Sequence, residues 1–148
     1  MSQSFFVLLA IAAGALIPAQ SSLNSVLGRT LGHPLWATGV VFLIGSVAWM
    51  LAYAAMRPAN PTWAATAAVP MYAWLGGLLA MAYVVLVVIV MPRLGAGLTT
   101  ALILLGQMVT ALTLDHFGLL GNVVHPMDWH RTLGLACIVG GVYFLRAY

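Results

Sequence analysis

The charged residues of this chain stand at the ends of long apolar stretches or between them, and this spacing limits the possible folds more than any other feature. Five arginines and two aspartates are the only residues with a formal charge among 148, and 64% of the residues are hydrophobic. A water-soluble domain of this length cannot cover its surface with so few polar groups. A membrane-spanning helix, in contrast, needs about 20 mainly apolar residues. The sequence therefore predicts an all-α, multi-pass membrane protein.

Five apolar stretches are long enough, or nearly so, to cross a bilayer, and clusters of Gly, Pro and Arg separate them. The N-terminal stretch has neither the basic start nor the small-residue cleavage site of a signal peptide, so we expect it to be retained. We place turns at residues 28–33 and 92–97. We expect one domain, residues 1–148, with five transmembrane helices at about 4–27, 34–56, 72–91, 98–114 and 132–148.

Patterns that carry enzymatic chemistry are missing from the sequence. It has no Gly-rich phosphate-binding loop, no Cys–His pair and no acidic residue deep inside a span. His116, His125 and His130 follow no recognised metal-ligand spacing, so we interpret them as solvated loop residues and not as a metal site. The arginines flank spans and do not form a patch for nucleic acid. We expect no enzymatic activity, cofactor, metal or nucleic-acid partner.

The first predicted helix changes character at Pro18, after which it carries several polar residues before any loop signal. Gln20 and Asn24 are four residues apart and share one helix face. A carboxamide facing lipid would leave its hydrogen-bonding groups unsatisfied, so both should point into protein or into a cavity. Pro18 removes a backbone hydrogen bond nearby and is a candidate hinge. A ligand site and simple helix–helix contacts both remain open as interpretations.

The fourth predicted span carries a polar face along its whole length. Gln107 lies near its middle, where an unpaired amide is costly, which favours a cavity-lining face over hydroxyls that only bond their own helix. Asp115, at the end of this span, is the one acid placed to titrate during a transport cycle, although capping or solvation is the simpler role. The polar face falls within an arc of about 140° and comprises Thr99, Thr100, Gly106, Gln107, Thr110 and Thr113.

Aromatic residues alternate with small ones on the second and third predicted spans. Trp49 and Tyr83 are candidate walls of a pocket for an apolar or cationic ligand. Close helix packing is the alternative, because small residues let helices approach one another. The two stripes are Phe42, Gly45, Ser46, Trp49 and Tyr53 on one span, and Tyr72, Gly76, Ala80 and Tyr83 on the other.

The arginines are nearly balanced between the two sides of the membrane. With five spans, one side holds Arg57 and Arg131, and the other holds Arg29, Arg93 and Arg146. Because arginine bias in short loops sets orientation, such a chain can insert both ways and pair antiparallel, giving an inverted repeat. The alternative is a weak bias that leaves the three-arginine side in the cytoplasm.

Several strings of this sequence are distinctive when they are taken together. They include GALIPAQSSLNSVLGRTLGHPLWAT (14–38), YAWLGGLLAMAYV (72–84), PRLGAGLTTALILLGQ (92–107) and LDHFGLLG (114–121). These strings resemble the YdcZ-type family of bacterial inner-membrane proteins, in the drug/metabolite transporter superfamily, and the resemblance covers nearly the whole chain. It implies a five-helix unit that occurs as antiparallel homodimers, as oppositely oriented pairs or fused in tandem, and that moves small molecules across the membrane. It also implies that the family's characteristic polar positions fall on Gln20, Asn24, Gln107 and Asp115.

The related small multidrug-resistance proteins have four helices and a glutamate in the first, which this sequence lacks, so their proton-coupled export of cations is in doubt here. We expect a ten-helix, dual-topology homodimer in the bacterial inner membrane, in contact with lipid, that transports an unassigned small molecule. A non-transporting scaffold and a channel-like pore are the alternatives. The predicted substrate-binding residues are Gln20, Asn24, Trp49, Tyr83, Thr100, Gln107 and Thr110.

Overall fold

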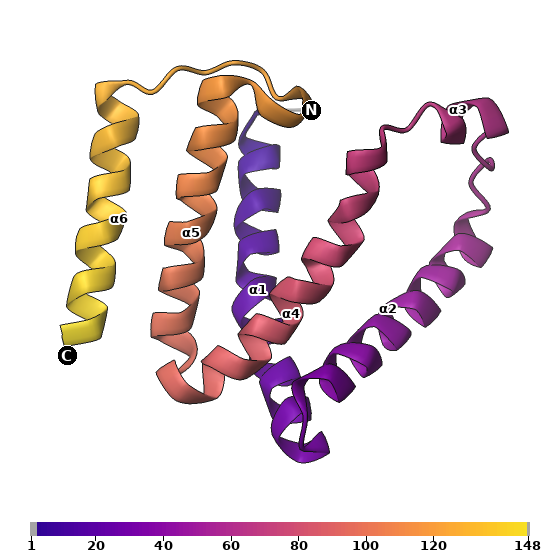
Figure 1. The fold of residues 1–148 in the computed structure, drawn as a ribbon, viewed down its shortest axis with the longest axis horizontal. Coiled ribbons are helices and arrows are strands. Elements are labelled where there is room, and N and C mark those ends of the chain that lie inside the picture. Colours follow the sequence, from indigo (N-terminus) through magenta and orange to yellow (C-terminus); the bar gives the residue numbers. More distant parts are fainter. Residues whose placement is uncertain (1–2, 148) are drawn as a thin grey trace. The chain divides into compact units, whose positions relative to one another are not determined.

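The computed structural model describes residues 3–147 and is helical throughout, as the sequence predicts (Figure 1). Six α-helices and two short 3-10 helices follow one another along these residues. Their bounds are α1 Gln3–Leu31, α2 Pro34–Met56, α3 Trp63–Ala67, η1 Met71–Trp74, α4 Leu75–Leu94, α5 Ala96–Phe117, η2 Leu119–Gly121 and α6 Trp129–Ala147.

Four segments between residues 3 and 147 are long and apolar enough to cross a membrane. They are α1, α2, the η1–α4 segment Met71–Leu94, and α5. The bounds of α2 coincide with those of the predicted second span. The predicted fifth span corresponds to α6, which carries Arg131 and Arg146 within 19 residues and is not among the four. Its last predicted residue, Tyr148, lies outside the described residues.

The chain divides into two compact units, Met1–Pro92 and Arg93–Tyr148. The first contains α1 to α3, η1 and α4 up to Pro92, and the second contains the last two residues of α4 together with α5, η2 and α6. The polar residues predicted from the sequence are therefore shared between the units: Gln20, Asn24, Trp49 and Tyr83 belong to the first, and those of α5 belong to the second.

Helices α1 and α2 pack as a hairpin in the first unit. A buried stripe of small and polar residues lies on α1, at the spacing of one helix face: Ser21, Asn24, Ser25 and Gly28. The turn is only two residues long, because α1 continues to Leu31 and α2 begins at Pro34. The predicted turn at residues 28–33 is thus wrong in its first four positions. Gly32, with φ of +75°, supplies the left-handed backbone that the turn requires.

A small apolar core joins these two helices to α4. Ala37 of α2 packs with Val84 and Val88 of α4, and Leu27 and Tyr83 cover the cluster. Helix α1 passes through Gly28, and the close approach of α4 explains why a residue without a side chain stands there. A Cβ at this position would overlap the Val88 side chain and would come within 3.8 Å of the Ala37 Cβ. The glycine lets α4 approach α1, and this contact is worth more than the modest helix-propensity cost of one glycine.

We therefore expect Gly28→Ala to destabilise the protein. The added methyl group has no free space, and overpacking of this kind costs about 1–3 kcal/mol. Thermal unfolding of the purified protein measures the effect. Gly14→Ala, in the same helix with nothing within 4 Å of its added Cβ, is the matched control and should leave the melting temperature unchanged or slightly higher. Adding Val88→Ala to Gly28→Ala should restore part of the loss, and equal melting temperatures for the two glycine variants would contradict this packing.

The end of α4 also differs from the prediction. The helix continues through Pro92 to Leu94, and Gly95, with φ of +77°, is the single residue between α4 and α5. The predicted turn at residues 92–97 is therefore reduced to one position. A proline removes one hydrogen bond near the end of a helix without stopping it at once, so Pro92 did not mark the boundary.

Helices α2 and α4 diverge toward the segment that connects them (Figure 1). Arg57 ends α2 in a left-handed conformation, and its N–H donates to the Tyr53 carbonyl at 2.8 Å. The Tyr53 hydroxyl donates to the Asn60 side-chain oxygen and ties the following loop to the helix. Helix α3 lies in this segment, where no helix is predicted from the sequence. Its first turn is capped by the Thr62 hydroxyl, which accepts from the Ala65 N–H at 3.2 Å.

Candidate functional site

A cavity of about 480 Å³ lies between α1, α2 and α4 in the first unit. Its volume falls within the range of about 300–1,000 Å³ that is usual for small-molecule sites. All three helices are candidate membrane spans, so the cavity belongs to the membrane-spanning part of the unit. The lining residues are Gln20, Val41, Phe42, Gly45, Ser46, Trp49, Ala80, Tyr83 and Val84.

Helical periodicity places these side chains together. Gly45 and Trp49 follow Val41 at intervals of four on α2, while Val84 follows Ala80 at the same interval on α4. Gly45 keeps the cavity open, because a Cβ added there would meet nothing within 4 Å. The Trp49 ring lies 5.7 Å from the Tyr53 ring, at an interplanar angle of 32°, which extends the aromatic wall along α2.

The free polar group of the cavity is the Gln20 carboxamide. Ser46 also lines the cavity, but its hydroxyl donates to the Phe42 carbonyl at 2.8 Å and is satisfied by its own helix. No hydrogen bond among residues 3–147 involves the Gln20 or Asn24 amide. Of the described residues that line the cavity, none is charged. The arrangement suits a molecule with an apolar or aromatic body and a hydrogen-bonding group.

Asn24 occupies a different place from Gln20, although the two share a helix face. It is 6% exposed and belongs to the buried stripe of α1 together with Ser21 and Ser25. It is not one of the residues that line the cavity. The structure thus brings Gln20, Trp49 and Tyr83 together around one cavity and leaves Asn24 beside it, in the packing region of α1.

The predicted polar residues of α5 lie in the second unit. Gln107 and Thr110 are exposed, and Thr100 is half-buried. The Thr113 hydroxyl donates to the Val109 carbonyl at 2.8 Å, so this residue bonds its own helix. Thr99 is 2% exposed, and its hydroxyl has no hydrogen-bond partner among residues 3–147. The polar face of α5 therefore presents an amide and hydroxyl groups that its own helix does not satisfy.

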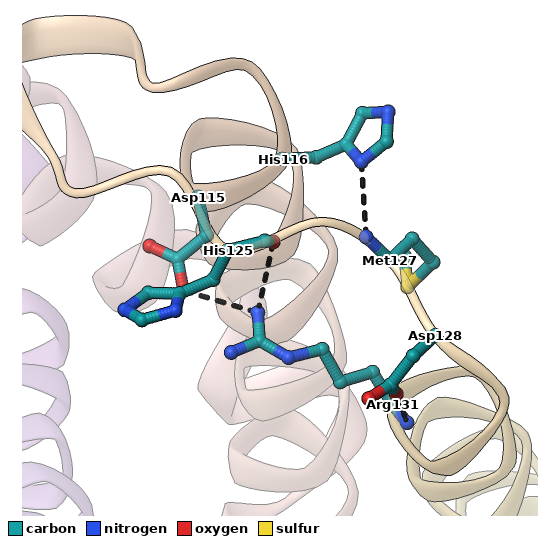
Figure 2. A network of polar contacts seen from close by, with 6 residues as sticks. All are labelled: Asp115, His116, His125, Met127, Asp128 and Arg131. Atoms are coloured by element: carbon teal, nitrogen blue, oxygen red, sulfur yellow. Dashed lines mark hydrogen bonds and ion pairs between the residues drawn. The ribbon is translucent and has the colours of Figure 1, made fainter.

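Asp115 belongs to a polar network that joins the end of α5 to the start of α6 (Figure 2). Its carboxylate lies 3.4 Å from the Arg131 guanidinium, which also donates to the His125 carbonyl at 3.3 Å. The Asp115 carbonyl accepts the His125 N–H at 2.9 Å. Asp115 is thus fixed by a residue sixteen positions further along the chain and is not a free acid at the helix end.

Two further contacts close this network. The His116 ring accepts the Met127 N–H at 3.0 Å, and the Asp128 carboxylate accepts the Arg131 N–H at 2.8 Å, which caps α6. Within residues 3–147, no three His, Cys, Asp or Glu side chains come together as a metal site. The His116 ring thus bonds the backbone of the α5–α6 connection directly, whereas His125 contributes its own backbone N–H and carbonyl.

We expect Asp115→Asn to lower the free energy of unfolding by no more than about 1 kcal/mol. Both partners of the Asp115–Arg131 pair are about one-third exposed, and pairs of this kind contribute little. Thermal unfolding measures the change, with Asp128→Asn as the control, because asparagine also caps helices well. If Asp115→Asn prevents folding, the pair is a structural necessity and our account of it is wrong.

Periodicity could not single out every residue of the cavity. Val41 and Val84 carry no polar or aromatic signal, and only the packing of α2 against α4 assigns them to the lining. The predicted stripes already contain four of the other lining residues, namely Phe42, Gly45, Ser46 and Ala80.

The comparisons with known proteins bear on the whole chain. A family model described as "Putative inner membrane exporter, YdcZ" matches residues 5–144. The match spans both units and therefore covers the cavity residues of the first and the polar face of the second. No curated protein and no solved structure gave a match.

Proposed function

The chain belongs to the YdcZ family of inner membrane exporters, and from this premise we propose that it exports small molecules through a site built on the cavity between α1, α2 and α4. The observation that carries the proposal is the cavity itself. It has the volume of a small-molecule site, it lies among membrane spans, and the Gln20 amide in its wall has no hydrogen-bond partner within residues 3–147. A scaffold protein has no need for such an opening.

We further propose that α6 is the fifth span. Its 19 residues give a length of about 28 Å, close to the thickness of the hydrocarbon core. Arg131 and Arg146 stand near its two ends, where long basic side chains reach the interfaces. With five spans, the termini of the chain lie on opposite sides of the membrane.

The working unit in this proposal is an antiparallel homodimer of ten helices. Two arginines on one side and three on the other give almost no preference for one orientation. The dimer also provides a role for the exposed Gln107 and Thr110 of α5, and for Thr100, as further substrate contacts. Each would otherwise place unsatisfied polar groups against lipid. Lipid surrounds the assembly, and the substrate is a small molecule.

Within the transport cycle we assign Pro18 as a hinge and Asp115 as a candidate coupling group. Pro18 lies two residues before Gln20 inside α1, so bending there would move the cavity amide directly. Asn24 is assigned a substrate contact that becomes available when α1 moves, because the residue is 6% exposed and its amide has no hydrogen-bond partner in the described chain. Asp115 is assigned the coupling role because its pair with Arg131 joins the end of α5 to the start of α6.

A thermal-shift screen of small molecules on the purified protein tests this function. A ligand that binds only the folded state at 100 times its dissociation constant stabilises it by about 2.7 kcal/mol. Gly45→Leu should abolish the shift, since the leucine fills the cavity without a backbone clash. Gly14→Leu, outside the cavity, should retain it. If no ligand shifts the wild type, or if Gly45→Leu responds fully, the cavity is not a binding site and a scaffold becomes the better account.

A further inference from the structure

A second cavity, of about 600 Å³, lies between α2 and α4. Four of its residues follow one face of α2 at helical spacing, and three belong to the first half of α4. Its lining is apolar apart from Thr38, whose hydroxyl donates to the Pro34 carbonyl at 2.9 Å. The lining residues are Leu35, Thr38, Gly39, Phe42, Gly77, Leu78 and Met81.

Phe42 lines both cavities. Its ring is therefore a wall shared by this mainly apolar cavity and the one that contains Gln20. The ring can be moved aside by a rotation about its side-chain bonds, which requires no change in the helices. Phe42 is thus the residue that the two linings have in common.

The apolar cavity lies within two membrane spans that diverge from each other (Figure 1). Leu35, Leu78 and Met81 are all exposed, with fractions of 52%, 63% and 43%. A cavity lined in this way has no group to replace the hydration shell of an ion. A molecule dissolved in the bilayer loses no hydration on entering it.

We propose that the Leu35–Met81 cavity is a side entrance through which an uncharged, lipid-soluble substrate passes from the bilayer to the cavity of Gln20, with Phe42 as the gate. This inference rests on the proposed function and adds the substrate class and route to it. The substrate has an apolar body that crosses the entrance and a hydrogen-bonding group that Gln20 receives.

Two adjacent glycines offer a matched test. Gly77 lines the entrance and Gly76 does not, and an added Cβ at either position meets nothing within 4 Å. Gly77→Leu should fill the entrance, whereas Gly76→Leu makes the same chemical change on another part of the helix surface. The probe is N-phenyl-1-naphthylamine, an uncharged aromatic amine that partitions into bilayers. Energy transfer from tryptophan to the probe is followed in lipid nanodiscs. The saturable part of the signal that Trp49→Phe removes reports the Gln20 cavity, because transfer to probe dissolved in the lipid rises without saturation.

We expect Gly77→Leu to slow association on the order of tenfold, which corresponds to a barrier higher by about 1.4 kcal/mol, with the dissociation constant unchanged. Gly76→Leu should associate as the wild type does, and Phe42→Ala should associate faster. Equal rates for the two leucine variants overturn the entrance. A raised dissociation constant with an unchanged association rate also contradicts the entrance. The absence of a Trp49-dependent signal in the wild type contradicts it as well. Dissociation of a dimer by Gly77→Leu alone, seen by light scattering, would assign the cavity to a second copy instead.

The proposed function is judged by a separate variant in the same assay. Gly45→Leu should remove equilibrium binding of the probe, because it fills the Gln20 cavity itself. Full binding by Gly45→Leu contradicts the proposed site whatever the rates are. Loss of binding there, together with equal rates for the position 76 and 77 variants, contradicts the entrance alone.

Discussion

Gln20→Leu should reduce transport about 10- to 100-fold while leaving the protein folded. The carboxamide is the polar group of the cavity that is free to bond a substrate, since the Ser46 hydroxyl is already bonded to Phe42. Loss of one hydrogen-bonding partner costs about 1–3 kcal/mol, which corresponds to this range of affinity. Leucine is close to glutamine in volume, so packing should change little. Efflux from cells and thermal unfolding of purified protein measure the two effects separately.

Two further variants test this interpretation of Gln20. Ser46→Ala should leave transport near the wild-type level, although Ser46 lines the same cavity, because its hydroxyl serves its own helix. Gln107→Leu should impair transport as Gln20→Leu does, if the α5 face belongs to the substrate path in the dimer. Failure of Gln20→Leu and Gln107→Leu to insert or fold would show that the amides hold helices together and do not face a cavity.

Orientation variants that are inactive alone should restore one another when they are expressed together. The wild type has two arginines on the N-terminal side and three on the other. Ala59→Arg and Val123→Arg, in exposed connections outside the helices, combined with Arg29→Gln and Arg93→Gln, give four arginines on the N-terminal side against one on the other. Thr30→Arg with Arg57→Gly gives one against four, and glycine suits the φ of +44° at position 57. Each set of changes should force one orientation.

Cysteine accessibility at Ala147→Cys, with Cys137 replaced by alanine, reports orientation from each side of the membrane. The wild type should be labelled from both sides and each biased variant from one side only. Activity should be lost in each variant and recovered on co-expression, because an antiparallel dimer needs both orientations. One-sided labelling of the wild type, combined with full activity of either variant alone, would require a parallel dimer or a different partner chain.

The helices could be predicted from hydrophobicity and spacing, but several of their ends could not. The cluster of Gly28, Arg29 and Pro34 predicts a turn over residues 28–33, whereas α1 continues through Gly28, where the missing side chain makes room for Val88 of α4. That contact joins residues sixty positions apart in the sequence, so local propensity carries no trace of it. Pro92 did not mark the end of α4, because the last turn of a helix tolerates a missing hydrogen bond.

The candidate site was predictable to the extent that it follows helix periodicity. The glutamine on α1 and the aromatic stripes on α2 and α4 do meet around one cavity. Periodicity alone could not distinguish the roles of Gln20 and Asn24. The two residues share a helix face, but one lines the cavity and the other lies in the packing region of α1. Nor could it pair Asp115 with Arg131, which depends on the path of the connection after η2.

Export by the reconstituted protein is the most direct test of the central claim that the α1–α2–α4 cavity is a transport site. Vesicles containing purified wild type, Gly45→Leu or Gly14→Leu would be loaded with the compound that gives the largest thermal shift. Our account predicts saturable flux for the wild type and Gly14→Leu, and none above the level of empty vesicles for Gly45→Leu. Saturable flux that persists in Gly45→Leu would contradict the site, and flux that rises linearly with concentration would indicate a channel-like pore instead of a transporter.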